Sequence, residues 1–434
     1  MPAASTAAIV TLGCKTNQYE SAAMEERLRE AGYTLVDFEA GAELVIVNTC
    51  TVTSSTDSQS RNLIRRARRF NAAARVVVTG CYAQVDPDRL RTIPGVSVVL
   101  GNDEKKDFLQ VLETAGEEGQ VRVSDIRRAE EAVPLRLSTF AERSRAFLQI
   151  QNGCDAFCSY CIIPYARGRS RSVPPEEVVS QTRALIEQGF PEVVLTGIHI
   201  GGYGSDLEPP LDLAGLTRRL TGETQVRRLR LGSVEPTEVP DDLIELVASS
   251  AAVCPHFHIP LQSGSDDILR AMNRHYDTAF FRRLIERIRS ALPDAAIGID
   301  VIVGFPGETD ELFEETRRFI DSLPVTHLHV FPFSRRPGTP AADMPGQVPG
   351  DVARERAARL RALGELKEEG FARQFVGRTL DVVVEGGSGG GLRKGMTRNY
   401  LTVHFPAGGD LVRKVVDVRI EAFADGRLVG QPAD

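Results

Sequence analysis

Three cysteines, Cys154, Cys158 and Cys161, lie within eight residues in the spacing C-x-x-x-C-x-x-C, directly after the apolar segment 146–150. We call them the Cys154 set. Three thiolates in this spacing can bind three irons of a 4Fe-4S cluster and leave the fourth iron without a protein ligand. An iron with an open coordination position can bind a substrate, so we place the chemistry of this chain here.

Two other interpretations of the Cys154 set rank lower. A structural zinc site needs four protein ligands, but after Cys161 no cysteine or histidine follows until His199, at the end of an apolar run. We therefore rank zinc second. Cys158-Ser-Tyr-Cys161 alone could form a thioredoxin-like redox pair, but Cys154 would then have no role and the expected strand-helix setting is missing. That interpretation ranks third.

Cys14, Cys50 and Cys81, which we call the Cys14 set, each lie just after a short β-branched segment. Right-handed crossovers bring the carboxyl ends of parallel strands to one edge of a sheet, so these thiols can converge despite wide sequence gaps. Any one of them is more commonly a small buried hydrophobe. Three at matching positions indicate a second three-cysteine iron-sulfur site.

The first part of the chain alternates short strands with helices, which predicts an open parallel α/β sheet. A charged connector with the alternating segment 120–123 follows it. The expected strands are 8–12, 44–47, 75–78 and 96–100, and the expected helices are 20–31, 58–70, 88–93 and 103–115.

Six apolar strands separated by helices, such as 175–188 and 308–323, predict a full or partial parallel (β/α) barrel whose active site forms from the loops after the strands. The strands are 146–150, 193–200, 228–232, 256–261, 296–303 and 327–333. Polar and glycine-rich loops follow these strands and let the backbone approach a ligand closely. The cofactor-binding residues expected there are Thr196, Gly197, Ser233, Gln262 and Gly304.

The histidines on these strands alternate as in partly buried, hydrogen-bonded positions, and we assign none as a ligand. They are His199, His256, His258, His327 and His329. Cys254 has no thiol neighbour in the sequence and is interpreted as structural.

After a charged helix at 351–370, short alternating segments separated by glycine-rich turns predict a small antiparallel β-barrel. The segments are 380–385, 400–405, 412–420 and 427–429. Residues 371–434 hold nine Lys plus Arg against seven Asp plus Glu, which is mildly basic beside the net charge of -7 for the chain. The glycine run 386–391 is expected to be a flexible loop.

Composition sets the remaining bounds. A chain of 434 residues allows roughly two to four domains. With 42% hydrophobic and 26% charged residues it is typical of globular proteins. Seven cysteines argue against a disulfide framework. No apolar run reaches the ~18 residues of a membrane span and no signal peptide is evident, so we expect a cytoplasmic protein. The acidic balance requires any nucleic-acid contact to come from local basic patches.

Four motifs together resemble the radical S-adenosylmethionine (SAM) methylthiotransferases over essentially the whole length: residues 13–21, 48–53, 80–84 and 158–168. The resemblance implies a methylthiotransferase domain at residues 1–116 with an auxiliary 4Fe-4S cluster on the Cys14 set, and a connector at 117–139. It further implies a radical SAM domain at 140–370, where the Cys154 set holds the cluster that binds SAM. The C-terminal domain at 371–434 would be a TRAM domain that grips RNA.

Within the family, residues 13–21 resemble the branch that acts on N6-threonylcarbamoyladenosine at position 37 of tRNA, and the isopentenyladenosine and ribosomal-protein branches differ around this cysteine. The implied partners are the tRNA anticodon stem-loop and an electron donor such as a flavodoxin or ferredoxin, with no membrane. In the implied reaction, reductive cleavage of SAM gives a 5'-deoxyadenosyl radical that abstracts hydrogen at adenosine C2. The auxiliary cluster carries the sulfur, and a second SAM methylates it.

Two alternatives remain: methylthiotransferases of the other branches, and a non-catalytic iron-sulfur protein that binds RNA or senses redox state. The basic segment Arg167-Gly-Arg169-Ser-Arg171 follows the Cys154 set. It could bind the carboxylate of SAM or an RNA phosphate, or form a solvated basic turn.

Overall fold

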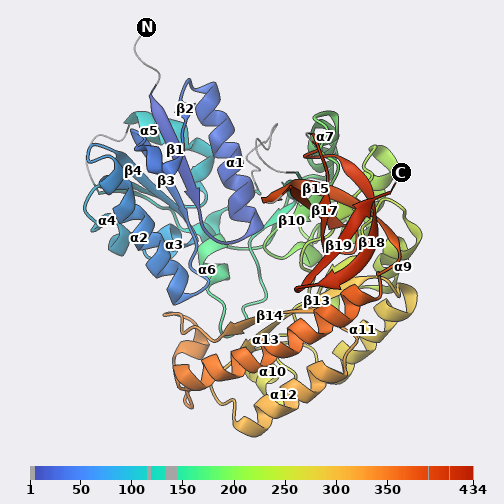
Figure 1. The fold of residues 1–434 in the computed structure, drawn as a ribbon. Coiled ribbons are helices and arrows are strands. Elements are labelled where there is room, and N and C mark those ends of the chain that lie inside the picture. The colour runs from blue at the N-terminus through green and yellow to red at the C-terminus, as the bar shows by residue number, and fades with distance from the viewer. Residues whose placement is uncertain (1–4, 115–118, 133–143, 390, 410, 434) are drawn as a thin grey trace.

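The structure is a computed structural model that describes residues 5–114, 119–132, 144–389, 391–409 and 411–433. Figure 1 shows an N-terminal α/β sheet, a central set of parallel strands covered by helices, and a C-terminal barrel. This arrangement confirms the predicted α/β fold class with a small β-barrel at its end. No helix in the described ranges is long and apolar enough to cross a membrane.

The N-terminal sheet is parallel throughout and has the strand order β2-β1-β3-β4-β5-β6. All six residues of β3 are buried, as expected for a central strand with both faces covered. The edge strands β2 and β6 were not expected, and β6 lies in the predicted connector. The strands are β1 (Thr6–Thr11), β2 (Thr34–Leu35), β3 (Leu44–Thr49), β4 (Arg75–Gly80), β5 (Val96–Leu100) and β6 (Gln120–Arg122).

Three helices of this domain, α1, α2 and α3, begin at or shortly after the three cysteines that follow β1, β3 and β4. Helix α1 starts at Lys15, earlier than predicted, and α3 starts at Cys81 itself. Thr53 caps α2, because its side chain accepts a hydrogen bond from the Thr56 N–H. The helices are α1 (Lys15–Glu30), α2 (Ser54–Phe70), α3 (Cys81–Val85), α4 (Pro87–Arg91) and α5 (Phe108–Thr114).

The central domain is a partial parallel barrel made of two three-stranded sheets, β11-β10-β7 and β12-β13-β14. Isolated bridges from Leu229 to Val253 and from Ser233 to His258 join them. Three strands end earlier than predicted because the chain turns into loops at Gly197, Gly232 and the residues before Pro260. The strands are β7 (Ala146–Gln149), β10 (Val193–Thr196), β11 (Leu229–Arg230), β12 (His256–His258), β13 (Ala296–Val303) and β14 (His327–Pro332).

Helices cover the outside of the partial barrel, and α11, α12 and α13 run along its lower side in Figure 1. The helices are α6 (Ile163–Arg167), α7 (Pro175–Glu187), α8 (Leu213–Glu223), α9 (Asp241–Ser249), α10 (Asp266–Ala271), α11 (Thr278–Ala291), α12 (Asp310–Ser322) and α13 (Gly350–Arg373). The two-residue strands β8 (Gln151–Asn152) and β9 (Arg171–Ser172) pair beside the Cys154 loop.

The C-terminal segment closes into a five-stranded barrel of order β15-β16-β17-β19-β18. Two details of the prediction were wrong. The barrel is not wholly antiparallel, because β17 and β19 pair in parallel. The glycine run is not only a loop, because its main chain continues β15 and pairs with the unpredicted β16. The strands are β15 (Thr379–Gly389), β16 (Leu392–Thr397), β17 (Thr402–Pro406), β18 (Val415–Ala424) and β19 (Arg427–Pro432).

Two buried arginines fix this C-terminal barrel to the central domain. Arg228 Nη2 donates to Met396 O at 3.1 Å, and Arg230 Nη1 donates to Arg398 O at 2.7 Å. Both guanidinium groups also pair with the buried carboxylate of Glu192. Burial alone would raise the pKa of Glu192, but Arg230 and then Arg228 lower it to about 2. The C-terminal barrel is therefore held by charge-assisted contacts and not by a loose linker.

Candidate active site

A glycine places the first cysteine of the Cys154 set. Gly153 has φ +78°, and a Cβ on it would lie 1.7 Å from the carbonyl oxygen of Arg169, so only glycine fits this turn. The Cys154 N–H then donates to Gly168 O at 3.0 Å, and the Cys161 N–H donates to Cys158 O at 3.0 Å. These bonds close the loop so that its three thiols lie at the carboxyl end of β7, as predicted.

Two side chains from distant loops contact the Cys154 set, and the sequence analysis did not assign either of them to it. His199 Nδ1 lies 3.6 Å from Cys154 Sγ, and Arg274 Nη1 lies 3.2 Å from Cys158 Sγ. Arg274 is also paired with Glu235. Hydrogen bonds to cluster sulfurs are one of the means by which proteins set cluster reduction potentials. No local pattern marks these residues, because each joins the loop only through the folding of the barrel.

The thiols of the Cys154 set are unpaired and lie close to one another. All seven cysteines are free. Burial, helped by the neighbouring Cys158 and Cys154 and opposed by the Ile163 N–H, raises the pKa of Cys161 to about 12. Buried thiols close to one another lose their protons readily only when a metal binds.

Each set offers three thiols, which is the number of protein ligands that a 4Fe-4S cluster with one open iron needs. Among the described residues, one group of three brings its ligand atoms within 4.8 Å of one another: His258, Asp300 and His329.

The Cys14 set comes together where two loops of the N-terminal sheet meet. Gly13 has φ +93°, and a Cβ there would lie 2.7 Å from Cys50 Sγ, so the Cys14 loop can approach Cys50 only with glycine. Asn17 Nδ2 donates to Thr49 O at 3.0 Å and ties the two loops together. Burial, and then the nearness of Cys81, raise the pKa of Cys50 to about 11. The three strand ends thus place the three thiols at one edge of the sheet.

Arg167, at the end of α6 in the central domain, reaches into the Cys14 set. Its guanidinium is fully buried, donates to Cys81 Sγ at 3.2 Å, and pairs with Glu20 on α1. Lys105 is buried against the same carboxylate. Burial alone would raise the pKa of Glu20, but Arg167 and Lys105 lower it to about 2. Two cations share one carboxylate, so an excess of positive charge faces thiols that become negative when they bind metal.

This network corrects the predicted role of the basic segment after the Cys154 set. Arg167 neither faces solvent nor is available to SAM or RNA phosphate. Arg171 is also buried, and its Nη2 donates to Arg167 O at 3.1 Å. Arg169 remains exposed. The segment joins two domains because its arginines satisfy buried acceptors, a use that charge patterning in the sequence does not reveal.

A cavity of about 250 Å³ lies between the Cys154 loop, the barrel and the Cys50 loop. The Cys154 loop contributes Tyr160, Cys161, Ile162 and Ile163; the Cys50 loop contributes Val52 and Thr53; the barrel contributes Gln262, Asp300, Ile302, Phe331, Pro332, Phe333 and Ser334. Loops that carry one cysteine from each set therefore line the same mostly apolar cavity.

Of the five residues expected to bind the cofactor, Gln262 lines this cavity. Gly304 packs against α13, where a Cβ would lie 2.5 Å from the Cβ of Ala353. Thr196 ends β10 and Gly197 lies against Gln151, while Ser233 pairs with His258. These four residues do not line the 250 Å³ cavity.

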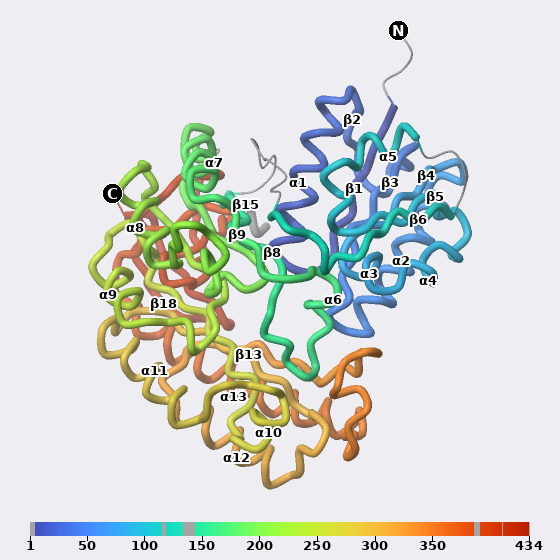
Figure 2. Tube along the Cα trace, turned by 180° about the vertical axis from the view of Figure 1, so that it is seen from behind, coloured from blue at the N-terminus to red at the C-terminus, as the bar shows by residue number. Residues whose placement is uncertain are grey.

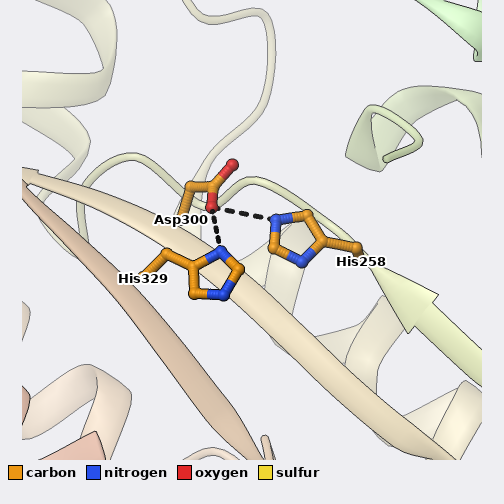
Figure 3. Close-up of side chains that lie close together, drawn as sticks. All are labelled: His258, Asp300 and His329. Carbon is orange, nitrogen blue, oxygen red and sulfur yellow. Dashed lines mark hydrogen bonds and ion pairs between the residues drawn. The ribbon is translucent and has the colours of Figure 1, made fainter. Parts of the chain in front are cut away.

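Two histidines meet at one carboxylate beside the cavity. His258 Nε2 lies 2.9 Å and His329 Nδ1 lies 3.2 Å from the same Asp300 oxygen, and Figure 3 shows both rings turned toward it. Burial would raise the pKa of Asp300, but these two hydrogen bonds hold it well below its usual value. Both histidines agree with the expectation of hydrogen-bonded side chains. Buried His256 does not, because neither ring nitrogen has a partner within the described residues.

Comparison with known proteins gives two family matches. The family described as Uncharacterized protein family UPF0004 matches residues 6–101, and the Radical SAM superfamily matches residues 148–320. The chain is 42% identical to the threonylcarbamoyladenosine tRNA methylthiotransferase MtaB of Bacillus subtilis, over 96% of this chain and 93% of that protein. The chain belongs to the radical SAM tRNA methylthiotransferases. The predicted family and enzyme class are thereby confirmed.

Other relatives place this methylthiotransferase among its neighbours. It is 34% identical to the tRNA-2-methylthio-N(6)-dimethylallyladenosine synthase of Desulfitobacterium hafniense, over 98% of this chain and 97% of that protein. The radical SAM methyltransferase TsrM of Kitasatospora setae, solved with cobalamin and a [4Fe-4S] cluster, matches with a TM-score of 0.57 at 19% identity, over 78% of this chain and 77% of that chain. The likeness to TsrM shows the fold alone. Membership of the radical SAM family assigns this methylthiotransferase SAM and an iron-sulfur cluster.

Proposed function

We propose that this methylthiotransferase adds a methylthio group to C2 of N6-threonylcarbamoyladenosine at position 37 of tRNA. The geometric observation that carries the reaction type is the cavity shared by the Cys161 and Cys50 loops. The substrate assignment is supported by relatives of 35 to 42% identity that carry the threonylcarbamoyladenosine name, against 34% for the dimethylallyladenosine synthase.

The Cys154 set holds a 4Fe-4S cluster that, when bound, supplies the electron for cleavage of SAM. The chain itself contributes a site for the adenosyl group in the 250 Å³ cavity, just below the ~300 Å³ at which typical ligand sites begin. Gln262 and Asp300 supply the polar contacts for ribose hydroxyls. Ile302, Phe331 and Phe333 form an apolar wall that excludes water from a reactive radical.

The Cys14 set holds the second cluster, which brings the number of clusters to two. Arg167 and Asn17 fix the loops of this set against the radical SAM domain. Arg336 acts at the other side, where its Nη2 donates to Thr51 Oγ1 at 2.6 Å, next to Cys50. A target base that enters between the two sets would then have its C2 near both. Holding the reactants in a fixed geometry is the main catalytic contribution of such contacts.

The RNA substrate meets aromatic and basic side chains. Phe157 and Tyr165 on the Cys154 loop and Phe331 at the cavity are exposed, and aromatic faces of this kind stack on splayed bases of single-stranded RNA loops. Lys394 and Lys414 are exposed on the C-terminal barrel and suit the phosphates of an anticodon stem-loop. A flavodoxin or ferredoxin is the class of electron donor that we expect.

Mass spectrometry of digested tRNA tests the assignment. Cells that lack this protein should lose 2-methylthio-N6-threonylcarbamoyladenosine and accumulate the unthiolated nucleoside, while 2-methylthio-isopentenyladenosine stays constant. Loss of the isopentenyl product instead would move the protein to the neighbouring tRNA branch. Anaerobic incubation with SAM and dithionite provides a second test, because a non-catalytic RNA-binding protein would form no 5'-deoxyadenosine.

A further inference from the structure

The side chain of Lys15 extends from the Cys14 loop toward the barrel. Lys15 is the first residue of α1 and directly follows Cys14. Its Nζ lies 6.0 Å from the centroid of the Phe147 ring on β7. Figures 1 and 2 show α1 on the side of the N-terminal sheet that faces the barrel, and the Tyr19 hydroxyl donates to Gln181 of α7 at 2.9 Å. The ammonium group of Lys15 therefore lies between the Cys14 set and the first barrel strand.

Within the part of the chain that the structure describes, this ammonium group has neither a hydrogen bond nor an ion pair. Other cations nearby do have carboxylate partners: Lys105 and Arg167 pair with Glu20, and Arg230 pairs with Glu192. Lys15 itself is half-buried, so its ammonium group is partly removed from water. A partly desolvated charge without a partner is costly, so the position favours an incoming anion.

Glu192 is the carboxylate whose charge acts on Lys15, and it is already committed to arginines. Glu192 Oε1 lies 2.7 Å from Arg230 Nε and 3.7 Å from Arg145 Nη1, and Glu192 Oε2 lies 3.0 Å from Arg228 Nη2. Three guanidinium groups thus share Glu192, and it has little capacity left for Lys15. The charge that remains at this position is positive, and a ligand carboxylate would complete it.

We propose that Lys15 binds the carboxylate of the threonylcarbamoyl group and so selects this substrate over a dimethylallyl-modified adenosine. The inference rests on the proposed function. A dimethylallyl group carries no charge and would leave the Lys15 ammonium partly desolvated and unpaired, which disfavours that substrate. Because Lys15 adjoins Cys14, the same contact would orient the base relative to the Cys14 set.

Binding of anticodon stem-loops tests the proposal directly. One RNA carries N6-threonylcarbamoyladenosine, and a second carries its methyl ester, which lacks the negative charge. Reconstituted wild-type enzyme should bind the acid about 10- to 100-fold more tightly, the usual size of a charged hydrogen bond. Lys15→Met should bind both RNAs alike, with the affinity that wild type has for the ester. Lys15→Arg should keep part of the preference.

Lys106→Met is the matched control, because Lys106 is an exposed lysine that pairs with Asp103, and it should keep the wild-type preference. Iron content of each variant shows whether the Cys14 set still binds metal. Should Lys15→Met lose iron, Lys15→Gln carries the same comparison. No acid preference in wild type, or an undiminished preference in Lys15→Met, would overturn the proposal.

Equal weakening of both RNAs by Lys15→Met would assign Lys15 to an RNA phosphate and also overturn it. If Lys15→Met raises the KM for SAM and leaves the RNA preference unchanged, Lys15 binds the SAM carboxylate, and the proposal is overturned. Failure of the proposed function can be told apart from failure of the Lys15 proposal. In that case the nucleoside digest would show that the wild-type product is not 2-methylthio-N6-threonylcarbamoyladenosine.

Discussion

Replacing Glu20 with glutamine removes the carboxylate that Lys105 and Arg167 share at the Cys14 set. Both cations are buried, so the variant leaves two charges without a counterion. The pKa of Glu20 is lowered from 4.5 to about 2. A shift of about 2.5 units corresponds to roughly 3 kcal/mol, which agrees with the ~3–5 kcal/mol usually lost when one partner of a buried ion pair is removed.

We therefore expect Glu20→Gln to lower the free energy of unfolding by about 3 kcal/mol at pH 7. The unfolding entropy is about 2.1 cal/mol/K per residue. If all 434 residues unfold together, the melting temperature should fall by about 3 °C; if the N-terminal domain unfolds alone, it should fall by about 10 °C. The variant should also lose iron from the Cys14 set before iron from the Cys154 set, because Arg167 loses the partner that holds it against Cys81.

The difference between wild type and Glu20→Gln should depend on pH. Because the folded-state pKa of Glu20 lies below its unfolded value, the unfolded state takes up the proton first as the pH falls. The contribution of Glu20 is thus complete above about pH 4.5 and is lost as the pH falls from 4.5 toward 2. The two proteins should differ by a constant amount between pH 6 and 8 and converge in acid.

Anaerobic thermal melts and iron analysis of the reconstituted proteins measure these effects. Glu30→Gln is the control, because Glu30 lies on the same helix and is exposed; it should change the melting temperature by less than about 1 °C. A melting temperature for Glu20→Gln equal to that of the control, with full iron content, would refute the inference that this carboxylate holds the two domains together.

Two further predictions concern the clusters and the RNA. Reconstituted wild-type protein should hold about eight irons. Changing the Cys154 set to alanine should remove half of them and stop formation of 5'-deoxyadenosine. Changing the Cys14 set should remove the other half but leave SAM cleavage, and Cys254→Ala should keep all the iron. A wild-type content near four would contradict the second cluster. The double change Lys394→Glu and Lys414→Glu should weaken binding to all tRNAs and reduce the slope of log K against log salt by about two; an unchanged slope would speak against RNA contact by this barrel.

The sequence determined the parts of this protein that depend on local spacing. The three thiols of the Cys154 set are close in the chain, so any fold that ends a strand before Cys154 presents them together. The alternating order of apolar strands and amphipathic helices likewise predicted the parallel sheet and the partial barrel. Each kind of element shows its own spacing of apolar residues, because its buried positions must be apolar. The Cys14 set was found by the same logic, since matching strand ends lie on one edge of a sheet.

Periodicity could not predict pairing that depends on the main chain alone. The glycine run of β15 pairs with β16 through backbone groups, and glycine has no side chain to alternate. The parallel pairing of β17 with β19 depends on how the barrel closes, because both strands would show the same alternation in either direction.

Only the tertiary structure decided which charges face the cysteines. Arg167 contacts Cys81 from 86 positions away, and Arg274 contacts Cys158 from 116 positions away. Such contacts arise when buried polar groups find partners across domains, where a low dielectric makes an unpaired charge expensive. In the sequence Arg167 and Lys15 are both cations close to a cysteine. In the structure Arg167 is paired with Glu20. Glu192 is shared by three arginines, which leaves Lys15 able to bind a ligand.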